Sequence, residues 1–115
     1  MIDPYPYLEE AVKMNGWITM DMVKELVTTG HMKLWARNNA VAATAEEDKL
    51  GKKILTIVLA GGNLEELKDI ESEIERYAIV NGFSEIYING RKGWERALQG
   101  YKTHMVIMRK GLNNG

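Results

Sequence analysis

One stretch limits the fold of this chain more than any other, because a long apolar run leads through two glycines into an amphipathic helix. Residues 54–60 are apolar apart from Thr56, Gly61 and Gly62 follow, and apolar residues then recur at helical spacing. A near-continuous apolar segment is typical of a strand that is buried on both faces. The stretch therefore predicts the first half of a β-α-β unit, with a tight turn at the two glycines.

The helix after the glycines has clear signals at both ends. Asn63 is suited to be its N-cap, Glu66 is placed to complete a capping box, and Asn81 with Gly82 is expected to end it. Its buried stripe is expected to contain residues at helical spacing: Leu64, Leu67, Ile70, Ile74, Tyr77 and Ala78. Residues 83–89 then alternate as a strand, which predicts a parallel strand pair joined by a right-handed crossover.

The first half of the chain predicts helices followed by an antiparallel meander. Two short helices are expected, one over residues 7–14 and one that starts at the N-cap Thr19. Residues 32–37 and 40–45 have the pattern of strands, and the charged segment 46–51 is expected to be the loop that leads to the buried third strand. Short connections favour antiparallel neighbours.

After residue 90 the chain predicts a short helix over 94–99 and a last strand over 101–108. The expected fold is therefore a single domain, residues 1–115, of the α/β (α+β) class. It has a mixed sheet of about five strands, in which an antiparallel meander is joined to one parallel pair, with helices on its flanks.

Composition and charge exclude several classes of function. The net charge is -1, which supplies no general field for nucleic acid or a membrane surface. The chain has no cysteine, so disulfides, thiolate metal sites and cysteine nucleophiles are ruled out. His31 and His104 have no second ligand at metal spacing, so no metal site is expected. No leader or membrane span is expected either, which predicts a soluble protein that is not exported.

Two turns are expected to lie at the carboxyl ends of the parallel strands, where ligands bind in α/β sheets. The first is Gly61-Gly62-Asn63, at a helix N-terminus that can bind anions, and the second is the segment 89–92. Arg91 and Lys92 would add the positive charge that a phosphate needs. A second interpretation stays open, in which the glycines only permit a tight turn and the two basic residues are solvated.

This order of elements resembles the fold of GNAT N-acetyltransferases. A closer resemblance lies in Leu34-Trp35 and in residues 59–67 and 90–98, which are similar to small GNAT-like proteins of tailed bacteriophages. The resemblance implies that the strand before the glycines binds the pantetheine arm of acetyl-CoA, and that the turn with the helix N-terminus holds the pyrophosphate. The expected cofactor-binding residues are Leu59, Ala60, Gly61, Gly62, Asn63, Asn89, Arg91 and Lys92.

The chain departs from the pattern of that family at two places. The usual motif is a basic residue or glutamine, two variable residues, glycine, any residue, then glycine or alanine, but here only Gly61-Gly62 remain. Glu65 and Glu66 follow in the first helical turn, where they complement the helix dipole and repel a pyrophosphate. Leu98 stands where catalytic members commonly carry a proton-donating tyrosine, so no catalytic residue is assigned.

Two functions follow from this resemblance. The first is a non-catalytic phage protein that serves as a virion, assembly or host-interaction component, with other phage or host proteins as partners and with no nucleic acid or membrane. Its location would be the cytoplasm of an infected bacterial host or the virion. The alternative is an acetyl-CoA-dependent N-acetyltransferase. The acceptor substrate and the oligomeric state are not set by the sequence.

Overall fold

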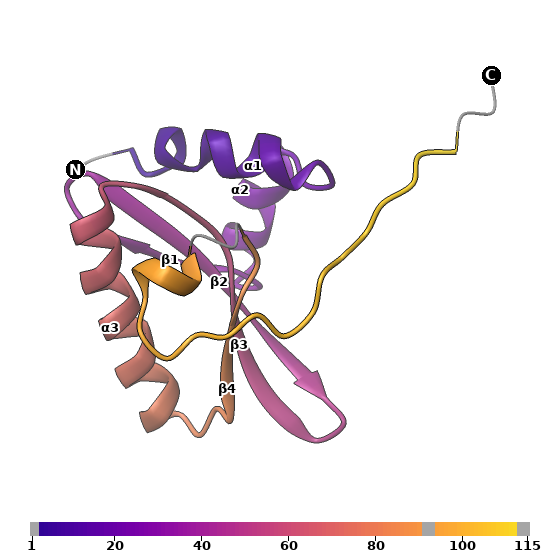
Figure 1. Cartoon of the computed structure of the whole chain (residues 1–115). Coiled ribbons are helices and arrows are strands. Elements are labelled where there is room, and N and C mark those ends of the chain that lie inside the picture. The colour runs from indigo at the N-terminus through magenta and orange to yellow at the C-terminus, as the bar shows by residue number, and fades with distance from the viewer. Residues whose placement is uncertain (1–2, 91–93, 113–115) are drawn as a thin grey trace.

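A four-stranded mixed sheet is the centre of the computed structural model, which describes residues 3–90 and 94–112 (Figure 1). The spatial order of the strands follows the chain: β1 (Lys33–Ala36), β2 (Ala40–Lys49), β3 (Lys52–Gly62) and β4 (Glu85–Ile88). The β1–β2 and β2–β3 pairs are antiparallel and the β3–β4 pair is parallel. The predicted meander and the predicted parallel pair are therefore confirmed.

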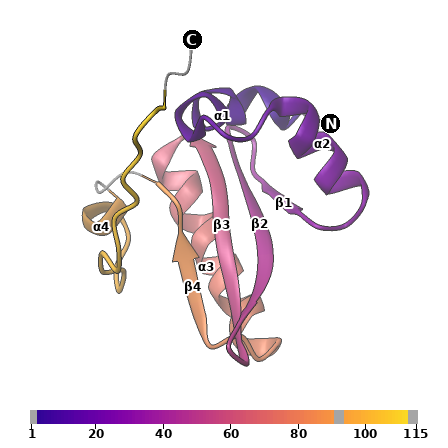
Figure 2. The same cartoon turned by 90° about the vertical axis from the view of Figure 1, so that its right-hand side faces the viewer.

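Helices cover both faces of this sheet. They are η1 (Tyr5–Leu8), α1 (Glu9–Asn15), α2 (Met20–Thr28), α3 (Leu64–Val80) and α4 (Trp94–Ala97). The α1–α2 pair lies against one face and α3 lies against the other, as Figures 1 and 2 show. The predicted N-cap of α2 is confirmed, because Thr19 Oγ1 accepts a hydrogen bond from Met22 N at 3.2 Å. None of the helices in the described residues is long and apolar enough to cross a membrane.

The sheet separates two hydrophobic clusters. The cluster under α3 contains Trp35, Ala40, Ala42, Leu55, Ile57, Leu67, Ile70, Ile74 and Ala78. The cluster under η1, α1 and α2 contains Leu8, Val23, Met32, Val41, Ala43 and Leu59. The buried stripe predicted for α3 is confirmed at Leu67, Ile70, Ile74 and Ala78, and Tyr77 packs against the same cluster but is only partly buried. Leu64 is exposed because it is the first residue of the helix and lies beyond the core.

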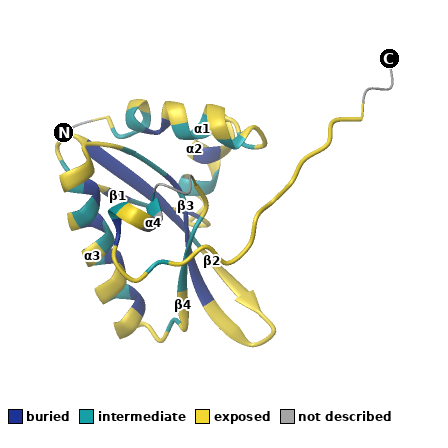
Figure 3. Ribbon diagram, viewed as in Figure 1, coloured by how far each residue is buried: buried dark blue, intermediate teal, exposed yellow. Residues whose placement is uncertain are grey.

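The charged segment 46–51 is not the loop that the sequence predicts. β2 continues to Lys49 and β3 begins at Lys52, so only Leu50 and Gly51 lie between the two strands. The N–H of Gly51 donates to Asp48 Oδ1 at 3.0 Å, which closes this tight turn. The end of the hairpin extends away from the helices and is exposed (Figure 3), so its strands can carry charged side chains without burying them.

The predicted last strand over residues 101–108 is also wrong. This segment forms no strand, so the sheet has four strands in the described residues instead of about five. Residues 101–112 form a tail that is extended and, after Tyr101, exposed. The hydroxyl of Tyr101 donates to Glu71 Oε2 on α3 at 2.8 Å. This bond draws the start of the tail toward α3, so the tail does not run alongside β4.

Candidate functional site

The strands β3 and β4 run side by side over only part of their length. Residues 54–57 of β3 pair with β4, and Asn89 N donates to Ile57 O at 3.0 Å just beyond the pair. β3 then continues to Gly62, whereas β4 ends at Ile88 (Figure 2). Among the described residues, the edge of β3 that faces away from β2 has no strand partner from residue 58 to 62. We call this place the β3–β4 split.

A β-bulge in β3 lies at the start of the split. Ile57 pairs with Thr44 of β2 and Leu59 pairs with Ala43, so Val58 has no partner of its own on β2. A bulge bends its strand and increases the local twist. The bend therefore accounts for the separation of β3 from β4 at this point.

The structure brings together the predicted cofactor-binding residues that it describes. They lie on the last residues of β3, at the N-cap of α3 and directly after β4: Leu59, Ala60, Gly61, Gly62, Asn63 and Asn89. Arg91 and Lys92 lie outside the described residues. The side chain of Leu59 points away from the split, because it is buried with Leu8 and Val23 beneath α1 and α2.

Apolar side chains from the region of α4 fill the α3 side of the split. Trp94 packs against the cluster under α3, and Leu98 is buried. The cavity that remains among Ala60, Ile88 and these two side chains is about 20 Å³ in volume. A space of that size holds at most one water molecule. The split is therefore closed on this side by the indole and by Leu98.

The two glycines are the last residues of β3 instead of a turn after the strand. Gly61 pairs with Val41, and Gly62 pairs with Ala40. A Cβ on Gly61 would overlap the backbone carbonyl oxygen of Tyr7, which crosses over the strand. A Cβ on Gly62 would lie 2.6 Å from Ala40 Cα, and the φ of Gly62 is +108°. Close approach of two backbone segments therefore requires glycine at both positions without any ligand.

The N-terminus of α3 is capped by the chain itself and carries negative charge. Asn63 Oδ1 accepts a hydrogen bond from Glu66 N at 3.0 Å, as predicted. The reciprocal half of the capping box is not formed, because Glu66 Oε1 accepts from Asn39 N at 3.0 Å and Asn63 N donates to Asn39 O at 2.7 Å. Glu65 and Glu66 both occupy the first turn, where they oppose the binding of an anion.

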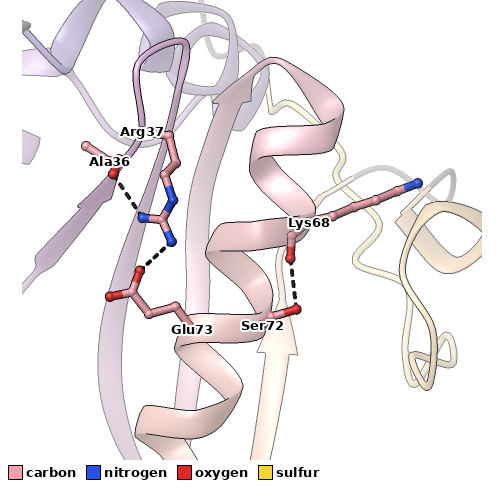
Figure 4. Close-up of polar contacts among 5 residues, drawn as sticks. All are labelled: Ala36, Arg37, Lys68, Ser72 and Glu73. Carbon is pink, nitrogen blue, oxygen red and sulfur yellow. Dashed lines mark hydrogen bonds and ion pairs between the residues drawn. The ribbon is translucent and has the colours of Figure 1, made fainter.

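A larger hollow of about 700 Å³ lies on the other side of the end of β3, among Tyr7, the β1–β2 turn and α3. The basic side chain among the residues that line it is Arg37, which donates to Ala36 O at 3.1 Å and to Glu73 Oε1 at 2.8 Å (Figure 4). Glu66 and Asp69 add two carboxylates to the wall. Because its arginine is already paired and it faces away from β4, the hollow is a poor place for a phosphate.

A carboxyl and a phenol meet beside the split. Glu71 lines the small cavity, and Tyr101 donates its hydroxyl hydrogen to the carboxylate. Burial raises the pKa of Glu71, the bond from Tyr101 lowers it, and the charge of Glu75 raises it, with a raised pKa as the net result. Burial, the hydrogen bond to Glu71 and the nearby charges raise the pKa of Tyr101 well above its usual value. Tyr101 is therefore a poor proton donor to a leaving group.

Sequence reasoning did not find this pair. The two residues lie 30 positions apart, and Tyr101 was expected to begin a strand. A weak signal was present on α3, where Glu71 directly follows the buried Ile70 and precedes Glu75 by one helical turn. A carboxylate next to an apolar stripe and near a like charge is a candidate for a raised pKa.

Two further polar side chains, Glu47 and His104, make contacts on the face of the sheet opposite α3. Glu47 Oε1 accepts a hydrogen bond from the buried Thr56 at 3.2 Å, and its carboxylate also lies 3.5 Å from Lys49 Nζ. The ring of His104 lies 5.8 Å from the ring of Tyr87. No group of three or more metal-ligating side chains is close enough to hold an ion within residues 3–90 and 94–112.

Comparisons with solved structures find the same fold at low sequence identity. The protein TTHA1254 of Thermus thermophilus is 14% identical, with a TM-score of 0.60 over 96% of both chains. An acetyltransferase of Trypanosoma brucei is 11% identical, with a TM-score of 0.57 over 97% of both chains. Glucosamine-6-phosphate N-acetyltransferase of Arabidopsis thaliana is 13% identical, with a TM-score of 0.55 over 85% of this chain and 82% of that one. No family model and no curated protein matches the sequence.

These likenesses establish a GNAT-like fold, which was the fold predicted from the sequence. They do not assign the activities of those proteins to this chain, because sequence identity this low shows the fold alone. The described residues also fit acetyl-CoA poorly. The split is filled by Trp94 and Leu98, the glycines are held by backbone contacts, and the first turn of α3 is acidic.

Proposed function

We propose that this chain uses the GNAT fold without acetyltransferase catalysis, as a virion, assembly or host-interaction component of a tailed phage. The observation that carries the non-catalytic part is the closed split. A pantetheine arm beside β3 would have to displace Trp94 and Leu98 from contacts with the core. The resemblance of residues 59–67 and 90–98 to small phage proteins supports the phage setting.

Calorimetric titration of the full chain with acetyl-CoA tests the non-catalytic part. We expect no saturable heat and no shift of the thermal midpoint at millimolar ligand, because a ligand that binds only the folded state must raise its stability. Injection of acetyl-CoA into buffer alone is the control for heats of dilution. Saturable heat that remains after this control is subtracted would contradict the proposal.

Mass spectrometry of purified virions and of assembly intermediates tests the phage setting. We expect peptides of the chain in at least one of these fractions at a constant ratio to a known structural protein. Recovery only from the soluble lysate, unassociated with any phage or host protein, would contradict a structural or assembly role.

One observation favours the alternative, an acetyl-CoA-dependent N-acetyltransferase. β3 and β4 are parallel and separate where the fold resemblance places the cofactor, beside residues 59–63. Under this alternative, the titration would show binding, and charge reversal at Arg91 and Lys92 would weaken it, because those side chains supply the positive charge for the pyrophosphate. Charge reversal without any change in binding would remove the assigned role of the two residues.

A further inference from the structure

The hollow beside the β1–β2 turn has the size of a ligand site. Its volume of about 700 Å³ lies within the range of about 300–1,000 Å³ that ligand pockets span. Its lining combines apolar groups with two carboxylates of α3: Pro4, Tyr7, Ala36 and Val41, then Glu66 and Asp69. The hollow is separate from the β3–β4 split, because no residue that lines it also lines the small cavity of the split.

Three carboxylates on α3 form a stripe that faces the β1–β2 turn. Glu66, Asp69 and Glu73 are spaced by three and four residues, which places them on one face of the helix. The first of them is bonded to the turn, because Glu66 Oε1 accepts a hydrogen bond from Asn39 N at 3.0 Å. The last is bonded as well, because Arg37 donates to Glu73 Oε1 at 2.8 Å (Figure 4). These two contacts hold this face of α3 against the turn.

Asp69, in the middle of the stripe, has no hydrogen bond or ion pair with any other residue in the part of the chain that the structure describes. Its side chain lines the hollow instead. The helix dipole does not account for its charge either, because that effect is limited to the first turn, which already contains Glu65 and Glu66. The stripe therefore carries one negative charge at the hollow that the chain itself leaves unmatched.

The charge of the lining favours a cation. The basic side chain in the lining is Arg37, and its guanidinium is already bonded to Glu73 Oε1 and to Ala36 O. Glu66 and Asp69 leave the lining with more negative than positive charge. Apolar walls strengthen the attraction between such carboxylates and a cation, because they lower the local dielectric constant.

The contacts of Arg37 show which kind of cation fits. Its guanidinium donates both to a carboxylate of α3 and to a backbone carbonyl, Ala36 O, at 3.1 Å. The hollow offers the same combination one helical turn earlier, where Asp69 supplies the carboxylate and Asn38 supplies a carbonyl. Asn38 O accepts from the Tyr7 hydroxyl at 3.3 Å and keeps a second lone pair. A guanidinium has several donors in one plane, and that plane can stack on a tyrosine ring.

We propose that the hollow binds a guanidinium group on an aliphatic stem, with Asp69 as the carboxylate that pairs with it. The stem packs against the apolar part of the lining, Pro4, Ala36 and Val41. An arginine side chain of a partner protein and a free alkylguanidine share this chemistry. The proposal does not depend on the proposed function, because the hollow and the split have no lining residue in common.

Titration of the full chain with butylguanidinium, followed by backbone amide chemical shifts in NMR spectra, tests the proposal. We expect saturable shifts at Asn38 and Asp69 with a dissociation constant of about 1–10 mM, the order that a ligand of about eight non-hydrogen atoms reaches. Butylurea has nearly the same shape without the charge. We expect it to bind at least about fivefold more weakly, because hydrogen bonds to charged groups are the stronger ones.

Asp69→Lys is the variant that removes the site. We expect no saturable binding of butylguanidinium, because the new ammonium repels it. Glu65→Lys is the matched control, since it makes the same change of charge on the same helix, but Glu65 pairs with Lys68 at 3.4 Å and does not line the hollow. It should bind butylguanidinium within about twofold of the parent chain.

Both variants should fold as the parent does, because Asp69 and Glu65 are exposed. Equal thermal midpoints check this. Asp69→Asn is a second variant that keeps the shape of the side chain, and we expect it to weaken binding by about three- to fivefold, the size of an ion pair that is open to solvent.

A blocked arginine, acetyl-arginine methylamide, distinguishes the two sources of the guanidinium. Binding at least as tight as that of butylguanidinium supports an arginine side chain within a partner protein. Weaker binding of the blocked arginine supports a free alkylguanidine, because the flanking amides then do not fit.

Three results would overturn the proposal. The first is the absence of saturable shifts at a large excess of butylguanidinium. The second is equal binding of butylguanidinium and butylurea, which would mean that the apolar lining alone attracts the ligand. The third is an equal loss of binding in Asp69→Lys and Glu65→Lys, which would mean that the total charge of α3, and not Asp69, attracts the cation.

Discussion

Replacing Gly61 with alanine will lower the free energy of unfolding by about 3 kcal/mol, the upper end of the range for overpacking, even with no ligand present. The new Cβ would overlap the carbonyl oxygen of Tyr7 and lie 3.1 Å from its carbonyl carbon. Both atoms belong to backbone, so they cannot move aside as the end of a flexible side chain can. The change is checked by urea unfolding of the variant and the parent chain.

The control for Gly61→Ala is Gly111→Ala, because nothing lies within 4 Å of a Cβ on Gly111. We expect that control to change stability by less than about 0.5 kcal/mol. The comparison separates the two interpretations of the glycine pair. A glycine kept only for close approach to a phosphate would leave the stability of the free protein unchanged, and that outcome would contradict the role of the Tyr7 contact.

The fold was predictable where the signals are local. Three signals each act over a few residues and correspond to observed elements: the apolar segment 54–60, the N-cap at Asn63 and the alternation after residue 82. The prediction of a loop over residues 46–51 was wrong. Charged residues usually mark loops, but a hairpin that extends past the core can carry charged side chains on both strands. The prediction of a strand over residues 101–108 was wrong because a strand-forming pattern does not by itself supply a neighbouring strand, and within the described residues this segment joins no sheet.

The location of the candidate site was predictable from the sequence, but the side chains and contacts found there were not. The rule that ligands lie at the carboxyl ends of parallel strands places residues 59–63 and Asn89 at the split. The contacts around the split join distant parts of the chain. Tyr7 near the N-terminus meets Gly61 at the end of β3, and Tyr101 meets Glu71 across 30 positions of sequence. No local pattern reports contacts of this kind.

Replacing Trp94 with alanine will lower the free energy of unfolding by about 3 kcal/mol, the lower end of the range for a buried tryptophan because the indole is only partly buried. The loss combines the apolar surface of the indole with the space that it leaves beside Ala60 and Leu98. Gly90 shows how closely the indole is packed, since a Cβ there would lie 2.9 Å from the ring. Thermal unfolding measures the change.

Trp17→Ala is the matched control for Trp94→Ala, because it removes the same side chain from an exposed position. Loss of its contact with Arg109 should lower stability by no more than about 1 kcal/mol. Equal losses in the two variants would show that Trp94 does not close the split. Titration of Trp94→Ala with acetyl-CoA then tests whether the indole alone keeps the cofactor out. Binding gained by the variant makes the indole the obstacle, whereas continued absence of binding assigns the obstacle to Leu98, the glycine contacts or the acidic first turn of α3.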